Sequence, residues 1–324
     1  MIPYIDMHCD TLMGSVDPKF SVIRNEGHVD LERLHSTGAM AQCFAVFLPQ
    51  RDWFAAHGHE KTSDEAYIRL ATGLLRSELD KASDLAAPAR TTAELEENFR
   101  SGRVSALLTM EDGRAVDGKL ENLDRFYEMG FRMIAPLWNY ENCFGYPNSS
   151  DPAVMRRPLK PFGRDAVERM GELGMIVDVS HLNEGGFWDV AALTKGPFVA
   201  SHSNARALSP HQRNLTDEQL RALGEHGGVA GVNFYGAFLQ PDGRTAVSTA
   251  ALIAKHARRI ADIAGMESVG IGSDLDGIGG QLEIPSTDRI PLLWDALRKE
   301  GFSEDDVERF AWKNVFRVWK EVVK

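Results

Sequence analysis

The strongest constraint on the fold is an alternation of short apolar runs with segments of helical periodicity along the chain. Runs such as MIVDVS and VSALLTM are apolar at nearly every position, which is typical of strands covered on both faces of a parallel sheet. Several intervening segments end at a glycine, a common signal at the end of a helix. The pattern predicts eight strands, at residues 3–8, 42–48, 104–110, 132–138, 175–180, 198–201, 229–234 and 269–273.

The same alternation predicts the fold class. Helices are expected at residues 63–83, 120–129, 162–173, 216–226, 291–298 and 303–323. Strands that are each followed by a helix or a loop favour an α/β protein with a closed (β/α)8 TIM barrel, with a doubly wound open sheet as the competitor. No Gly/Ser-rich or Pro-rich linker divides the chain, so we expect residues 1–324 to form a single barrel domain.

Charge and composition exclude several classes of protein. The 36 Lys and Arg residues against 47 Asp and Glu residues give a net charge of −11, which disfavours nucleic-acid binding. No run approaches about 18 apolar residues, and the N-terminus MIPYIDMHCDTL has no signal-peptide pattern. The three cysteines suit reduced thiols. We therefore expect a cytoplasmic protein without nucleic-acid or membrane partners.

Side chains that bind metals occur at the carboxyl ends of five predicted strands, where a barrel of this kind assembles its chemistry. They are His8, Asp10, Glu111, His181, His202 and Asp274. Taken one at a time, each also fits a structural role, as a capping carboxylate or a hydrogen-bonded core histidine. Their common position at strand ends, in contrast, is what a site for two metal ions requires.

The spacing of these residues agrees with shared ligation. His8 and Asp10 are two residues apart on a strand, so both side chains point to the same face. Glu111 can bridge two cations through its two oxygens, whereas an imidazole gives one nitrogen to one ion. Asp274 and Asp276 are two residues apart, so both could face the centre of the barrel. We assign Asp274 to the site because it lies nearer to the strand.

The ligand types predict the metal and the reaction. A mixed nitrogen and oxygen set without cysteine favours Zn²⁺ and leaves Mn²⁺, Co²⁺ or Fe²⁺ as substitutes. Two divalent ions about 3.5–4 Å apart hold a water or hydroxide between them, generate a nucleophile near neutral pH and polarise a carbonyl group. The sequence therefore predicts two Zn²⁺ ions per chain and a hydrolase.

These residues and their neighbours resemble the membrane (renal) dipeptidase family, metallopeptidase M19, among the amidohydrolase-type barrels. The matching segments are IDMHCDTL, TMEDG, VDVSH, ASHSNAR and GIGSDLDG, in family order between residue 4 and about residue 320. The resemblance implies a barrel of the metal-dependent hydrolase type that cleaves the amide bond of a dipeptide by a metal-bridging hydroxide, with tolerance of a D-residue at the C-terminal position. The absence of a signal sequence and of a hydrophobic C-terminal tail is typical of a soluble bacterial relative.

The resemblance also implies a role for each site residue. The five ligands are divided between two ions, with His8 and Asp10 on one, His181 and His202 on the other, and Glu111 bridging them. Asp274 exchanges protons with the hydroxide and the leaving amine, and Arg213 binds the carboxylate of the substrate. A guanidinium group is a bidentate partner for a carboxylate, although a surface salt bridge explains an arginine at this position equally well.

One position departs from the family pattern. Where the family usually has Leu-Thr-His-Asn after the fourth strand, this chain has Pro136, Leu137, Trp138 and Asn139. An indole donates one N–H but neither binds a metal nor accepts a proton as imidazole does. We expect Trp138, or its neighbour Asn139 or Tyr140, to contact the substrate here, unless the substrate binds differently.

The segment that follows Trp138 is long and aromatic. It is predicted to form an inserted loop at about residues 139–160 over the active site, with a packed surface loop as the alternative. Near the other end of the chain, Trp312, Phe316, Trp319 and Val323 recur at helical spacing. That stripe predicts core packing or a contact in a homodimer.

Three alternative functions stay open beside a dipeptidase with a small dipeptide substrate. Another amidohydrolase would act on a non-peptide amide, a lactone or an ester; many of these enzymes bridge their metals through a carboxylated lysine after the fourth strand, and RMIAPLW has none. A glycosidase would use Glu111 and Asp274 as paired carboxylates, which leaves the histidines unexplained. The third is a catalytically impaired relative that retains a metal, which the tryptophan at position 138 suggests.

Overall fold

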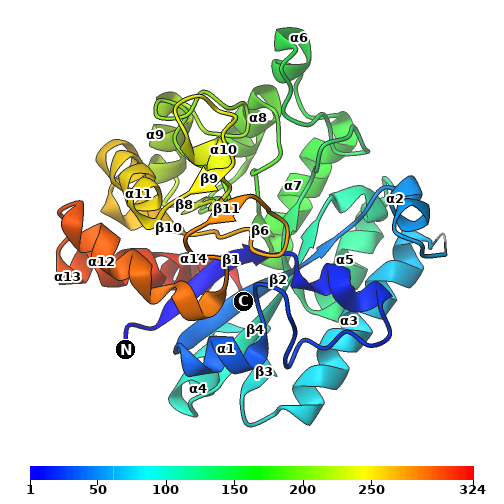
Figure 1. The fold of residues 1–324 in the computed structure, drawn as a ribbon. Helices are drawn as coiled ribbons and strands as arrows, with labels where there is room; N and C mark the ends of the chain where they lie inside the picture. The colour runs from blue at the N-terminus through cyan, green and yellow to red at the C-terminus, as the bar shows by residue number, and fades with distance from the viewer. Residues whose placement is uncertain (61) are drawn as a thin grey trace.

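Eight parallel strands form a nearly closed barrel in the computed structural model, which describes residues 1–60 and 62–324 (Figure 1). Around the barrel the order is β6-β5-β4-β2-β1-β10-β8-β7, and the ring meets again between β6 and β7 at the isolated bridge of Asp178 with Val199. The eight strands are β1 (Tyr4–Cys9), β2 (Ala39–Phe47), β4 (Val104–Glu111), β5 (Phe131–Ala135), β6 (Ile176–Val177), β7 (Val199–Ala200), β8 (Val229–Val232) and β10 (Val269–Ile271). The predicted (β/α)8 TIM barrel is thus confirmed, and the open sheet is excluded.

Helices connect the strands and surround the barrel (Figure 1). In chain order they are α1 (Leu31–Ser36), α2 (Arg51–Ala56), α3 (Asp64–Lys81), α4 (Thr92–Arg100), α5 (Leu120–Met129), α6 (Pro152–Met155), α7 (Pro161–Leu173), α8 (Glu184–Leu193), α9 (Asp217–Glu225), α10 (Gly236–Leu239), α11 (Ala250–Ala264), α12 (Pro291–Lys299), α13 (Glu304–Glu308) and α14 (Asn314–Val322). Three short strands had not been predicted: β3 (Ala86–Pro88) pairs with β4, while β9 (Val247–Ser248) pairs with β11 (Gln281–Leu282).

Local sequence signals explain where the helices begin and end. A capping box of Thr91 and Glu94 starts α4, and a second one of Thr216 and Gln219 starts α9, so the first free N–H groups of each helix have acceptors. Helix α5 ends at Gly130, whose φ of 108° is a conformation that favours glycine. The predicted helix boundaries at residues 120–129, 162–173 and 216–226 are correct to within one residue.

Several predictions about element length were wrong. Strands β5 and β6 end several residues before the predicted positions 138 and 180. After β6 the pairing continues only as the isolated bridge of Asp178 with Val199, and the Asp178 carboxylate accepts hydrogen bonds from the backbone and hydroxyl of Ser180. The helix predicted at 303–323 is α13 and α14 with a π-helical turn, Arg309–Lys313, between them, and Phe310 of that turn is buried.

The C-terminal helix α14 closes the amino end of the barrel. Its buried Val315, Val318 and Trp319 join one hydrophobic cluster with residues from the first halves of the strands, such as Ile5 and Val229. The predicted core packing of the C-terminal stripe is therefore confirmed for Trp319. With one end filled by side chains, the open end of the barrel is the carboxyl end of the strands.

None of the helices in residues 1–60 and 62–324 is long and apolar enough to cross a membrane.

Candidate metal centre

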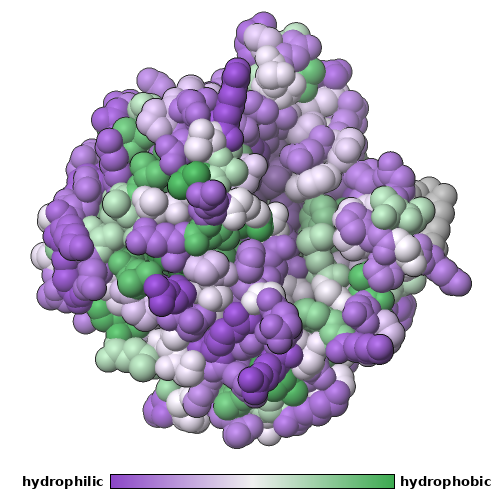
Figure 2. All heavy atoms as spheres, viewed as in Figure 1, coloured by the Kyte–Doolittle hydropathy of each residue, from purple (hydrophilic) through white to green (hydrophobic). Residues whose placement is uncertain are grey.

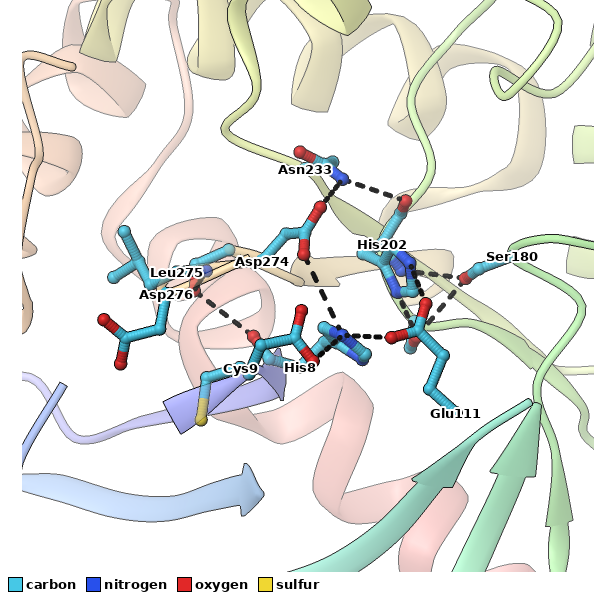
Figure 3. Close-up of polar contacts among 12 residues, drawn as sticks. His8, Cys9, Glu111, Ser180, His202, Asn233, Asp274, Leu275 and Asp276 are labelled. Carbon is cyan, nitrogen blue, oxygen red and sulfur yellow. Dashed lines mark hydrogen bonds and ion pairs between the residues drawn. The ribbon is translucent and has the colours of Figure 1, made fainter. Parts of the chain in front are cut away.

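Six predicted side chains converge at the carboxyl end of the barrel. His8 of β1 is central, because its Nε2 atom lies 3.6 Å from Asp10 Oδ1, 3.5 Å from Glu111 Oε2 and 3.9 Å from Asp274 Oδ1 (Figure 3). Cys9, between His8 and Asp10, points away from this group, as alternation along a strand requires (Figure 3). All three carboxylates therefore face one imidazole.

Glu111 lies between two sets of ligands. Its Oε2 atom faces His8, while its Oε1 atom lies 2.8 Å from His181 Nε2 and 3.7 Å from His202 Nε2. The Nε2 atoms of His181 and His202 are 2.9 Å apart. A carboxylate with one oxygen toward each set has the geometry of a bridging ligand.

The residues fit a bound metal on two observations. His8 Nε2 and Asp10 Oδ1 are buried and have no hydrogen-bond partner among the described residues, which is costly unless another group takes their lone pairs. Ligand atoms of His8, Glu111 and His202 all lie within 4.8 Å of one another, and so do those of His8, Asp10 and Asp274. Nitrogen and oxygen donors in this combination suit a divalent transition metal.

The carboxylates of the cluster repel one another. Burial raises the pKa of Glu111 to about 8, and the charge of Asp10 adds to this effect. Burial also raises the pKa of Asp274 to about 6, against the favourable charge of His8. Both shifts have the same cause, the burial of anionic oxygens with little positive charge beside them, and a bound cation would offset that cost.

The surroundings of the two histidines on the other side of Glu111 disfavour their protonated form. Burial lowers the pKa of His181 well below its usual range, and Arg213 contributes to the shift. Burial does the same for His202, with a contribution from His8. A neutral imidazole keeps a lone pair on one nitrogen, which is the form that binds metals.

Hydrogen bonds on the far side of each ring direct its Nε2 atom toward Glu111. The Nδ1 atom of His181 lies 3.1 Å from Asn139 Oδ1, and that of His202 lies 2.7 Å from Ser201 Oγ. The hydroxyl of Ser201 in turn donates to Asp178, which also accepts from the Ser201 backbone N–H at 2.9 Å. With protons on both Nδ1 atoms, as these acceptors favour, both lone pairs face the centre.

A second buried aspartate has the same arrangement on the other side of the barrel. Asp6 accepts from the backbone N–H of Ser273 at 2.9 Å and from the Ser273 hydroxyl, and it also accepts from the His8 backbone N–H at 3.2 Å. Sequence reasoning missed Asp6 and Asp178. The available signal was their spacing, because each precedes a predicted ligand by two or three residues within an apolar strand.

The structure shows which of Asp274 and Asp276, two residues apart in the sequence, belongs to the cluster. Asp274 has a left-handed φ of 61°, and its Oδ2 atom accepts from Asn233 Nδ2 at 2.8 Å, so that Oδ1 faces His8 (Figure 3). Asp276 lies outside the cluster and binds Thr11 Oγ1 at 2.6 Å. A Cβ atom on Gly277 would lie 2.1 Å from Asp10 Oδ2, so the close turn there requires glycine.

The cluster opens into a cavity of about 670 Å³ (Figure 2). Arg213 lines it while being almost fully buried, with Nη1 3.3 Å from Ser203 Oγ and Nη2 2.9 Å from His181 Nε2. Among the residues expected to contact the substrate, Trp138 and Asn139 line the cavity. Tyr140 is not among the lining residues, and it is 52% exposed.

The segment 139–160 contributes to one wall of this cavity through Asn139, Asn148, Ser149 and Ser150. Its helix α6 protrudes from the body of the molecule on the same side (Figure 1).

Comparisons with known proteins agree with this geometry. A sequence model of the membrane dipeptidase family, peptidase family M19, matches residues 1–324. The chain belongs to the membrane dipeptidase family. The resemblance inferred from the strand-end motifs is thereby confirmed, and the chain is an enzyme of the M19 dipeptidases, which are metal-dependent.

Two solved structures of this family superpose on nearly the whole chain. A metallopeptidase from Rhodobacter sphaeroides, liganded with a phosphinate mimic of the dipeptide L-Ala-D-Ala, is 30% identical with a TM-score of 0.89 and covers 100% of this chain and 99% of its own. The dipeptidase AC of family M19 is also 30% identical, with a TM-score of 0.88 and 99% of each chain covered. Among sequence relatives, a protein from the pqqA 5′ region of Klebsiella pneumoniae is 40% identical over 70% of this chain and 85% of its own length.

Proposed function

We propose that the protein is a binuclear zinc dipeptidase that hydrolyses dipeptides, including those with a D-residue at the C-terminal position. The five proposed zinc ligands are His8 and Asp10 for one ion, His181 and His202 for the other, and Glu111 for both. The observation that carries the proposal is the position of Glu111, whose two oxygens face separate sets of ligands at 3.5 Å and 2.8 Å. Two zinc ions, when bound, supply a nucleophile from water near neutral pH and polarise the scissile carbonyl.

The substrate contacts are assigned by charge. Arg213 is the cationic side chain of the cavity wall, and it is proposed to pair with the carboxylate of the dipeptide. Asp10, Glu111 and Asp274 also line the cavity and give it negative charge, which suits the free amino group of a dipeptide. We propose that this distribution of charge orients the dipeptide across the site.

Asp274 is the proposed proton carrier. Its Oδ1 atom faces the cluster while Asn233 holds Oδ2, so the carboxylate has one oxygen free for proton transfer. A carboxylate in this position takes a proton from the attacking water and gives it to the leaving amine. The D-residue tolerance is supported by the L-Ala-D-Ala mimic bound to the Rhodobacter sphaeroides relative.

The test combines metal analysis with turnover. The purified enzyme is stripped with a chelator, reconstituted with Zn²⁺, Mn²⁺, Co²⁺ or Fe²⁺, and assayed with matched L,L- and L,D-dipeptides. We expect full activity at two zinc ions per chain and almost none in the stripped protein. If the reconstituted protein cleaves no dipeptide, or is fully active with one ion, the proposal is wrong.

A further inference from the structure

The cavity over the metal centre has an aromatic side. Phe47, Trp53 and Trp138 line it, and we call these three side chains the aromatic wall. Phe47 is the last residue of β2, Trp53 belongs to α2, and Trp138 follows β5. The rings of Phe47 and Trp138 meet edge to face with centroids 4.8 Å apart, so these two side chains form a continuous apolar surface.

The aromatic wall is adjacent to the bridging carboxylate. In the sheet, Phe47 is paired with Glu111, and Glu111 is paired with Ala135 at the end of β5. The wall therefore occupies the sector of the barrel mouth formed by β2, β4 and β5. Trp53 joins the wall as a lining residue of the same cavity, and its indole stacks on His57 at the end of α2, with centroids 4.3 Å apart and an angle of 26° between the planes.

Arg213 belongs to a different sector. It follows β7, and the strand order places β7 at the far end of the path from β4 through β2, β1, β10 and β8. In the other direction around the ring, β5 and β6 separate β4 from β7. The proposed ligand His181 lies next to both groups, since its Nε2 atom is 2.9 Å from Arg213 Nη2 and its ring centroid is 6.4 Å from that of Trp138.

This arrangement determines where each part of a dipeptide lies, and the argument rests on the function proposed above. With its carboxylate at Arg213 and its amide carbonyl beside Glu111, a dipeptide has its amino-terminal residue on the β2, β4 and β5 side. One residue spans at most about 3.6 Å of extended chain, so the amino-terminal residue stays close to the metal centre and to the strands that border Glu111. Its side chain is the part of the substrate that meets Phe47, Trp53 and Trp138.

We propose that the aromatic wall is the specificity site for the side chain of the amino-terminal residue, and that the preferred substrates are dipeptides with a large aromatic or branched apolar residue there. The three wall side chains are uncharged, so they gain from apolar contact and leave a charged side chain poorly solvated. The α-amino group of the same residue faces Asp10 and Glu111. The site therefore separates recognition of the amine from recognition of the side chain.

The first experiment uses the unmodified zinc-loaded enzyme. Dipeptides with a constant C-terminal alanine and Gly, Ala, Leu, Phe, Trp, Lys or Glu at the amino terminus are compared by kcat/KM. We expect Leu, Phe and Trp to exceed Gly and Glu by at least about 10-fold, the discrimination that an apolar pocket supplies. If dipeptides are cleaved with a flat profile, the wall proposal is overturned and the dipeptidase proposal stands; if none is cleaved, the dipeptidase proposal itself fails.

The second experiment locates the preference on the wall. Trp53→Ala should reduce the ratio of kcat/KM for Phe-Ala over Gly-Ala by about 10-fold, and Trp53→Phe should restore most of it. The matched control is Trp188→Ala, which removes a tryptophan that is 44% exposed on α8 and should leave the ratio unchanged. A Phe47→Leu variant repeats the test on β2. An unchanged ratio in both wall variants overturns the proposal.

Discussion

Replacing Ser201 by alanine tests how the second layer of the site controls zinc binding. The change deletes the hydroxyl that lies 2.7 Å from His202 Nδ1 and bonds to Asp178. Asp178 retains the Ser180 hydroxyl at 2.7 Å and the backbone N–H groups of Ser180 and Ser201 at 3.0 and 2.9 Å. The carboxylate thus stays satisfied, and the loss falls mainly on the imidazole.

The expected loss of zinc affinity follows from the hydrogen bond that His202 loses. An imidazole N–H left unpaired in a buried site costs about 1–3 kcal/mol, and the ring is then free to adopt the other tautomer, in which Nε2 carries the proton. Loss of such a partner typically weakens metal binding by about 10–100-fold. We therefore expect Ser201→Ala to bind its second zinc ion about 10–100-fold more weakly, while Ser201→Thr keeps the hydroxyl and the affinity.

The assay is competition for zinc against a chromophoric chelator, with the melting temperature recorded for each variant. Ser273→Ala is the matched control, because Ser273 makes the same hydroxyl and backbone bonds to Asp6 but contacts no imidazole nitrogen. Equal loss of zinc affinity in the two alanine variants would refute the reasoning. So would an unchanged affinity in Ser201→Ala.

Three further predictions concern two other residues of the cluster and one buried histidine outside it. His181→Ala should lower the metal content by about one ion per chain in elemental analysis, whereas His226→Ala, which removes a histidine outside the cluster, should not. Asp274→Asn should retain both ions and lose about 100-fold or more in kcat; near-normal turnover would exclude it as the proton carrier. Burial lowers the pKa of His256 to about 4, so below its ordinary pKa of 6.5 the unfolded chain binds a proton that the folded state does not. Stability is therefore lost as the pH falls through this range, and urea titrations should show that His256→Gln avoids about 2 kcal/mol of the loss between pH 7 and pH 5.

The sequence predicted the barrel because its strands are apolar on both faces and its helices carry strong end signals. Residues 104–111, for example, are buried at nearly every position in the structure, as the run VSALLTM indicates. Strands of two or three residues, such as β9 and β11, carry too few positions for any periodicity and were missed. Near the early end of β6, Asp178 accepts a hydrogen bond from the backbone of Ser201, 23 residues away, and a local pattern contains no such contact.

The candidate site was predicted in part for the same physical reason. The ends of strands can be predicted from the sequence, so the six side chains that the structure brings together could be selected by position alone. The aspartates that form hydrogen bonds behind them could not be predicted, because Asp6 bonds to a serine 267 residues away and Asp178 to one 23 residues away. Asn139 was expected at the substrate, and the structure places it against His181 as well as in the cavity.

The pairing of β1 with β10 has a consequence for how the enzyme matures. Asp6 of the first strand is in register with Ile271 of the last, so the ring is incomplete until about five-sixths of the chain has been synthesised. A nascent chain that ends at α11 contains the five proposed zinc ligands, from His8 to His202. It lacks β10, the strand that brings Asp274 beside them. The proposed proton carrier is therefore the last part of the site to reach its place, and catalytic activity is expected only once β10 has closed the ring onto β1.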